Sequence, residues 1–181
     1  MSRFKSLSGL WVASLLVLTA FPAVWAQGRS EAPQMVTGRL SFETLGLGAR
    51  VEVYEVARGA RVRVWKTGVA ADIDGLPLGA KVENTFRMRK GGMKRFVLVL
   101  RNHGKQPLYF FAAPHQVLPP QQGIGFRFKC LCVSQVFKVP PNWVWYRVIA
   151  LKLFRSFRGG PIELRHTLVR IGAREANRIM R

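Results

Sequence analysis

The sequence predicts an all-β protein built as an antiparallel β-sandwich. Eight or nine short segments are rich in β-branched and aromatic residues. In several of them apolar and polar residues alternate, as they do in a strand with one buried face. Turn-forming residues separate the segments, and strands do not alternate with helical segments. The 181 residues suffice for one domain with its own core and short appendages.

The expected strands follow one another along the chain. Segment 50–56 places Val51 and Val53 on one face, and segment 60–65 alternates in the same way. Segment 94–102 is apolar on both faces, which predicts a strand buried on both sides. The full set of expected strands covers residues 39–46, 50–56, 60–65, 82–89, 94–102, 107–114, 125–137, 144–154 and 158–171.

Residues 1–26 have the pattern of an export signal. Arg3 and Lys5 precede an apolar run without charges, and Pro22 stands before small residues that suit cleavage after Ala26. An uncleaved anchor in the inner membrane is the alternative, and both interpretations place the remainder in the periplasm. We therefore expect a signal peptide or anchor at 1–26, a linker at 27–38, a β-sandwich domain at 39–172 and a C-terminal tail or short helix at 173–181.

The chain is strongly basic, with 29 Lys and Arg against 9 Asp and Glu and a formal net charge of +20. An exported protein meets little nucleic acid, so we expect no nucleic-acid partner. Anionic lipid headgroups or an acidic membrane-protein surface are the expected partners, and a solvated basic surface is the alternative. The densest positive cluster is the predicted loop that carries Arg87, Arg89, Lys90, Lys94 and Arg95.

The chain has two cysteines, Cys130 and Cys132, in the segment FRFKCLC. If this segment is a strand, both side chains lie on one face with Cα atoms about 6.6 Å apart. That separation is near the upper limit for a disulfide. Two neighbouring thiolates are instead half of a site for a soft metal ion. The pattern therefore predicts a metal site at Cys130 and Cys132.

Copper(I) is the metal that this pair favours. Soft thiolates select Cu(I), with zinc as the competitor. Zinc normally takes four ligands, so it would have to recruit histidines or a second protomer. Cu(I) is satisfied by fewer ligands, or by two such pairs that meet across a homodimer. Free cysteines are also common in cores, so two metal-free buried thiols are the alternative.

The cysteine segment and its surroundings resemble the CtaG family of cytochrome c oxidase assembly proteins. The resemblance lies in FRFKCLCVSQ, preceded by QPLYFFAAP and followed by VFKVPPNWVWYRVIALKL and GPIELRHTLVR, and it covers roughly residues 60–171. Leu131 and Val133 stand where the family has aromatic residues, so the chain resembles a divergent member. The resemblance implies an immunoglobulin-like sandwich and a copper chaperone for the Cu-B centre, with Cu(I) on Cys130 and Cys132.

Three histidines and two methionines are possible further ligands of a metal ion. His115 follows a proline at a strand end and is an outside candidate for an auxiliary ligand. His103 lies in a turn and is expected in solvent, and His166 is expected to be a core histidine with its hydrogen bonds satisfied. Met88 and Met93 flank the basic loop and are weak candidates. The sequence contains no recognisable catalytic constellation, so we expect no enzyme.

These observations predict an exported copper chaperone. It would deliver Cu(I) from Cys130 and Cys132 to a membrane copper enzyme, such as a cytochrome c oxidase subunit. Its basic surface would orient it on the membrane or on that client. The alternative is a metal-free periplasmic β-sandwich module that binds anionic partners through the basic surface.

Overall fold

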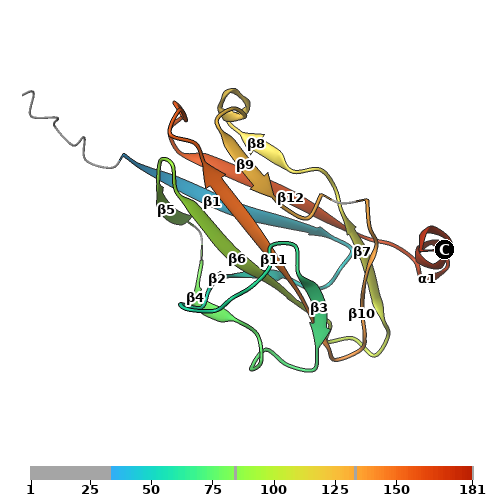
Figure 1. The fold of residues 1–181 in the computed structure, drawn as a ribbon. Coiled ribbons are helices and arrows are strands. Elements are labelled where there is room, and N and C mark those ends of the chain that lie inside the picture. Colours follow the sequence, from blue (N-terminus) through green and yellow to red (C-terminus); the bar gives the residue numbers. More distant parts are fainter. Residues whose placement is uncertain (1–33, 84, 133, 181) are drawn as a thin grey trace, which may run out of the picture. The chain divides into compact units, whose positions relative to one another are not determined.

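The computed structural model describes residues 34–83, 85–132 and 134–180, which form a sandwich of two six-stranded sheets (Figure 1). The predicted all-β sandwich is therefore confirmed. The elements are β1 (Met35–Leu45), β2 (Val51–Val56), β3 (Thr67–Ala70), β4 (Leu78–Lys81), β5 (Thr85–Arg89), β6 (Met93–Arg101), β7 (Leu108–Ala112), β8 (Gln116–Leu118), the 3-10 turn η1 (Pro120–Gln122), β9 (Phe126–Lys129), β10 (Phe137–Val139), β11 (Val144–Leu153), β12 (Ile162–Arg170) and α1 (Ala173–Ile179).

Each sheet is named here after the strand that pairs with three others. The β12 sheet has the order β10-β7-β12-β1-β5, and β8 also pairs with β12. The β11 sheet has the order β3-β11-β6-β2-β4, and β9 also pairs with β11. Strands β1 and β12 run parallel, and the other pairs are antiparallel. Two strands therefore share one edge of β12, and two others share one edge of β11.

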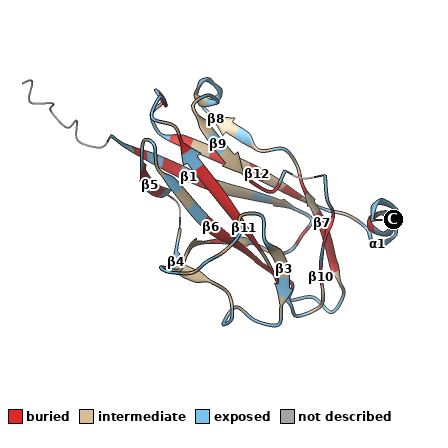
Figure 2. Cartoon of the chain, in the orientation of Figure 1, coloured by how far each residue is buried: buried red, intermediate tan, exposed pale blue. Residues whose placement is uncertain are grey.

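The main core fills the space between the two sheets, where β6 and β11 carry long buried stretches and alternate residues of β12 are buried (Figure 2). A second, smaller cluster covers the outer face of the β11 sheet, where Val97, Val99 and Val144 pack under residues from the segment between β3 and β4. Strand β6 is thus buried on both faces, as its sequence predicts. The short helix α1 packs through Ala176 against Tyr109 and Val136.

Three sequence-based expectations differ from the structure. Strand β1 begins at Met35, so the last residues of the expected linker pair with β5. Residues 60–65 form no strand: Trp65 has a φ of 69°, which turns the chain, and pairing with β11 begins at Thr67. The single strand expected over 125–137 is two strands, β9 and β10, which belong to different sheets.

The expected signal or anchor at 1–26 lies outside the described residues. Among the residues that are described, no helix is long and apolar enough to cross a membrane.

Candidate metal centre

The strand pairing along one edge of β12 is interrupted, and two histidines lie at the interruption. Strand β7 pairs with residues 168–170 of β12 and β8 pairs with residues 163–165. Between them, Ala113 donates a backbone hydrogen bond to Thr167, and Pro114 then has no N–H to continue the ladder. His115 therefore leaves the ladder. His166 lies on β12 opposite this gap and points into the sandwich, like its apolar neighbours Leu164 and Leu168.

The edge of β11 has a matching break that frees the cysteines. Strand β9 ends at Lys129, opposite Ala150. The next edge position on β11 is Val148, whose N–H donates to Lys66 and whose C=O accepts from Trp65. Because these groups are taken, the chain cannot continue as a strand along β11, and it crosses to the β12 sheet to form β10. The prediction that both cysteines lie within a β-strand is therefore wrong.

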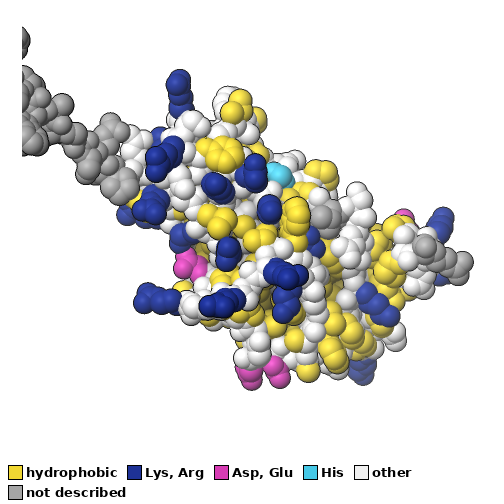
Figure 3. Space-filling model, viewed as in Figure 1, with side chains coloured by type: hydrophobic (Ala, Val, Ile, Leu, Met, Phe, Trp, Pro, Cys, Tyr) yellow, Lys and Arg dark blue, Asp and Glu magenta, His cyan; other side chains and the backbone are white. Residues whose placement is uncertain are grey.

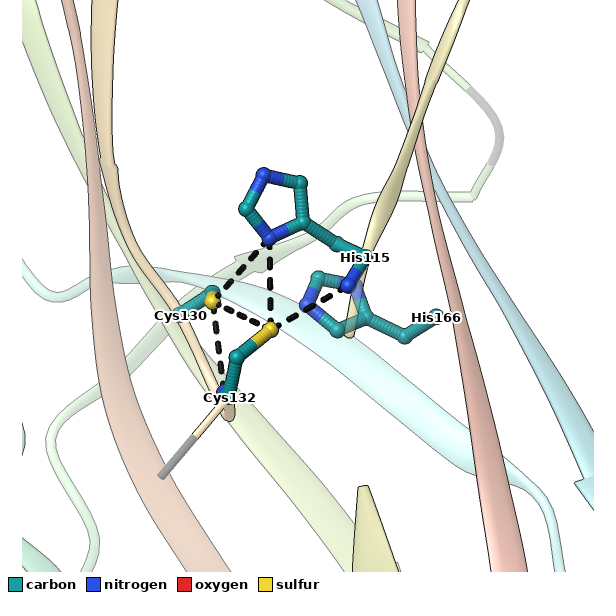
Figure 4. A group of neighbouring side chains, drawn as sticks. All are labelled: His115, Cys130, Cys132 and His166. Carbon is teal, nitrogen blue, oxygen red and sulfur yellow. Dashed lines mark hydrogen bonds between the residues drawn. The ribbon is translucent and has the colours of Figure 1, made fainter. Parts of the chain in front are cut away.

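The crossing nevertheless brings the two sulfurs together, facing the two histidines (Figure 4). The Sγ atoms of Cys130 and Cys132 are 2.9 Å apart, and the Cys132 N–H lies 3.3 Å from the Cys130 Sγ. His115 Nδ1 lies 3.2 Å from the Cys132 sulfur and 3.4 Å from the Cys130 sulfur, and the His115 backbone N–H donates to the Cys132 sulfur. One ligand atom from each of His115, Cys130, Cys132 and His166 lies within 4.8 Å of the others.

His166 is the residue whose role the sequence analysis missed. It is buried, as expected, but neither ring nitrogen has a hydrogen-bond partner among the described residues. Its ring stacks on Phe42 and lies against Phe128 and His115, with centroids 5.3 to 5.5 Å away. Burying a polar group without a partner costs free energy. A metal ion bound by the ring would remove that cost, which makes His166 a candidate ligand.

The two thiols differ in their affinity for a proton. Hydrogen bonding with Cys132, together with burial, raises the pKa of Cys130. The same hydrogen bond, helped by those with His115, lowers the pKa of Cys132. Cys130 Sγ thus acts as the donor to Cys132 Sγ. A deprotonated sulfur is the form that binds a metal, and the surroundings of Cys132 favour that form.

The four side chains also differ in their access to solvent. Cys132 is exposed, His115 is half-buried, and Cys130 and His166 are buried. Cys132 borders a surface groove of about 550 Å³. The groove is lined by Phe111, Ala112, Ala113, Pro114, Cys132, Ser134, Gln135, Val136, Glu175 and Ile179. Another molecule can therefore approach the cluster from the Cys132 side.

The other weighed residues lie elsewhere. His103 is exposed, as expected. Met88 is buried in the core on β5, and Met93 is exposed at the start of β6. Neither histidine of the cluster is close in sequence to the cysteines or to the other, so spacing alone could not group them. The sequence feature that indicates His115 is the preceding Pro114, since proline ends a strand ladder.

Two sulfurs and two imidazole nitrogens match the ligands of tetrahedral zinc sites and suit soft Cu(I). Fold and cluster together define the class: an all-β sandwich with a Cys/His cluster that could hold a metal ion. Within that class, the chain belongs to a family described as a domain of unknown function, DUF8709, whose model matches residues 36–171. That span includes all four cluster residues. No curated protein and no solved structure matches the chain.

Replacing His166 with leucine distinguishes a metal ligand from a core residue. The metal-free variant should be as stable as the wild type or up to about 2 kcal/mol more stable, because an unpaired buried imidazole is removed. Metal at 100 times its Kd should stabilise the wild type by about 2.7 kcal/mol and the variant much less. Urea unfolding under reducing conditions, with and without Zn(II) or Cu(I), measures both effects.

The matched control is His103→Leu, which changes an exposed histidine outside the cluster. It should keep the full stabilisation by metal. If His166→Leu also keeps it, His166 is no ligand.

Proposed function

We propose that this protein is a copper chaperone that carries Cu(I) on Cys130 and Cys132, with His115 and His166 as further ligands. The observation that supports this most directly is the meeting of two sulfurs and two imidazoles around one point, with one sulfur open to the surface. All four candidate ligands come from one chain. The proposal therefore needs no second protomer, although a metal-linked homodimer was one expectation from the sequence.

A structural role for the metal is disfavoured by the size of the core. Zinc holds together small domains that cannot bury enough apolar surface on their own. Here the main cluster fills the sandwich, and residues such as Phe96, Leu151 and Leu164 are fully buried within it. A metal at the cluster is therefore better understood as an ion that the protein transports than as one that stabilises the fold.

Transfer of the cargo would follow from the unequal burial of the ligands. An acceptor that reaches the groove meets the exposed Cys132 first, while Cys130 and His166 stay buried. Cu(I) tolerates low coordination numbers, so an acceptor ligand can bind before Cys132 leaves. The copper would thus move by ligand exchange, and no step requires a free ion or a change of oxidation state.

The client and the compartment extend the proposal beyond the cluster. The resemblance to the CtaG family motivates a membrane copper enzyme such as cytochrome c oxidase as the client. The signal-like residues 1–26 motivate a periplasmic location. Export also makes two thiols vulnerable to oxidation, and a bound metal would protect them.

We further propose that a basic face on the β11 sheet docks on anionic lipid. This face consists of Met93, Arg95, Arg127, Lys129 and Lys152, which pair across β6, β11 and β9 and point away from the core. None of them takes part in a salt bridge among the described residues. Figure 3 shows Lys and Arg gathered over this region. Exposed Met93 and Trp65 add the apolar contacts typical of interfacial binding.

The copper proposal predicts one Cu(I) per chain in protein loaded anaerobically under reducing conditions. Cys130→Ser and Cys132→Ser should each weaken binding at least 100-fold, because each removes a thiolate that soft Cu(I) prefers. Competition with a chromophoric Cu(I) chelator measures the affinity. Circular dichroism verifies that both variants keep the wild-type fold.

Met93→Ala is the matched control, since it removes an exposed sulfur outside the cluster and should leave the affinity unchanged. Wild-type affinity in a Cys130→Ser, Cys132→Ser double variant would refute the copper proposal. If the wild type binds no metal but still binds anionic vesicles, the metal-free interaction module is the better account.

The lipid proposal predicts binding to vesicles that contain phosphatidylserine and not to neutral vesicles. Reversing Arg127 and Lys152 to glutamate should weaken binding by at least about 2 kcal/mol, roughly 30-fold, because each lost positive charge contributes about 1 kcal/mol. Added salt should weaken the wild type as well. Vesicle co-sedimentation measures both effects. Reversing Arg174 and Arg178 on α1 is the control, and an equal loss there would point to net charge rather than to the basic face.

A further inference from the structure

Arg147 is a buried cation whose charge no carboxylate balances among the described residues. It lies on β11 between Trp145 and Ile149, which both point into the core, and it is only 3% exposed. The salt bridges of the described chain involve Lys81, Lys94 and Arg165 and not Arg147. A charge buried in a protein normally has a counter-charge, because desolvation is otherwise too costly.

The contacts of Arg147 hold the guanidinium in place without neutralising it. Its Nη1 donates a 2.8 Å hydrogen bond to the Thr67 hydroxyl, and its Cζ lies 5.5 Å from the centre of the Phe137 ring. Its Nε is buried with no hydrogen-bond partner among the described residues. The guanidinium is therefore held by a neutral hydroxyl and an aromatic ring, and its Nε–H has no partner among the described residues.

The charges that act on Arg147 are those of the two cysteine sulfurs in their deprotonated form, which is the form that binds a metal. Burial lowers the pKa of Arg147, and the charges of Cys130 and Cys132 raise it. Phe137, which the guanidinium contacts, begins β10 at the end of the crossing segment that carries the cysteines. The strand register agrees with this: Lys129, the residue before Cys130, pairs with Ala150, which is three residues from Arg147 on β11, so the crossing segment begins beside the part of β11 that carries Arg147.

We propose that Arg147 is a specificity-determining residue that favours Cu(I) over Zn(II) at the cysteine–histidine cluster. The inference rests on the proposed function and concerns the same site. Two thiolates and two neutral imidazoles carry a net charge of −1 around Cu(I) and of zero around Zn(II). A fixed positive charge nearby stabilises the Cu(I) complex and not the zinc complex, and it does so most in a poorly solvated interior.

The test compares the affinities of the whole protein for Cu(I) and Zn(II), each measured by chelator competition. Arg147→Met keeps the volume and removes the charge, and replacing a buried charge by a similar apolar group is often tolerated. It should lower the ratio of Cu(I) affinity to Zn(II) affinity about 10-fold or more. Arg147→Lys keeps the charge and should keep most of the ratio, which a merely structural role for the side chain does not predict.

Thr67→Val controls for loss of the hydrogen bond alone and should change the ratio little, even if it lowers stability. Equal ratios for the wild type and Arg147→Met, with Cu(I) still bound tightly by both, would overturn this inference and leave the chaperone proposal intact. Absence of Cu(I) binding by the wild type would overturn both. If Arg147→Met does not fold, Arg147→Gln decides by the same ratio.

Discussion

The candidate metal centre depends on a competition for the backbone of one residue. Val148 can bond only one partner on the outer edge of β11, and the chain around Trp65 and Lys66 occupies it. Strand β9 therefore stops at Lys129 and the chain crosses between the sheets. If β9 continued, Leu131 would pair with Val148 and both cysteines would belong to the β11 sheet. Because β9 ends at Lys129, the two sulfurs lie instead in the segment that crosses between the sheets.

The break on β12 completes the arrangement from the other side. Between β7 and β8 the strand pairing along β12 is interrupted at residues 166–167, and Pro114 has no N–H with which to continue it. His115 comes from the gap itself and His166 from the strand behind it. The candidate ligand set therefore contains two side chains that lie with β12 and two that follow β9. A metal bound by all four would take ligands from both breaks in the strand pairing.

Local patterns predicted the sandwich, because each strand carries its own periodicity. Strand β6 shows this well. Its apolar residues on both faces predict burial on both sides, and its two faces lie in two separate apolar clusters. The same reasoning was wrong for residues 60–65 and for the cysteine segment. Both have strand-like alternation, yet they compete for one edge of β11, and a local pattern cannot say which segment obtains the hydrogen bonds. The expectation that His166 has its hydrogen bonds satisfied was wrong for a related reason, since the surroundings of its ring depend on a break in the strand pairing.

The hydrogen-bond partners of the buried polar side chains support a binding site at the cluster. Three polar or charged residues of the described chain are buried: Asn102, Arg147 and His166. Both polar atoms of the Asn102 side chain are hydrogen-bonded, since its amide nitrogen donates to three backbone carbonyls and its oxygen accepts from the Gly104 N–H. A buried polar side chain with a structural role thus has its hydrogen-bond partners in this fold. His166 keeps both ring nitrogens unpaired, and Arg147 keeps its charge unbalanced by any carboxylate. A metal ion bound by sulfur and nitrogen would accept the lone pair of the His166 ring. With Cu(I) as the ion, the complex would also carry a net negative charge that balances the Arg147 guanidinium.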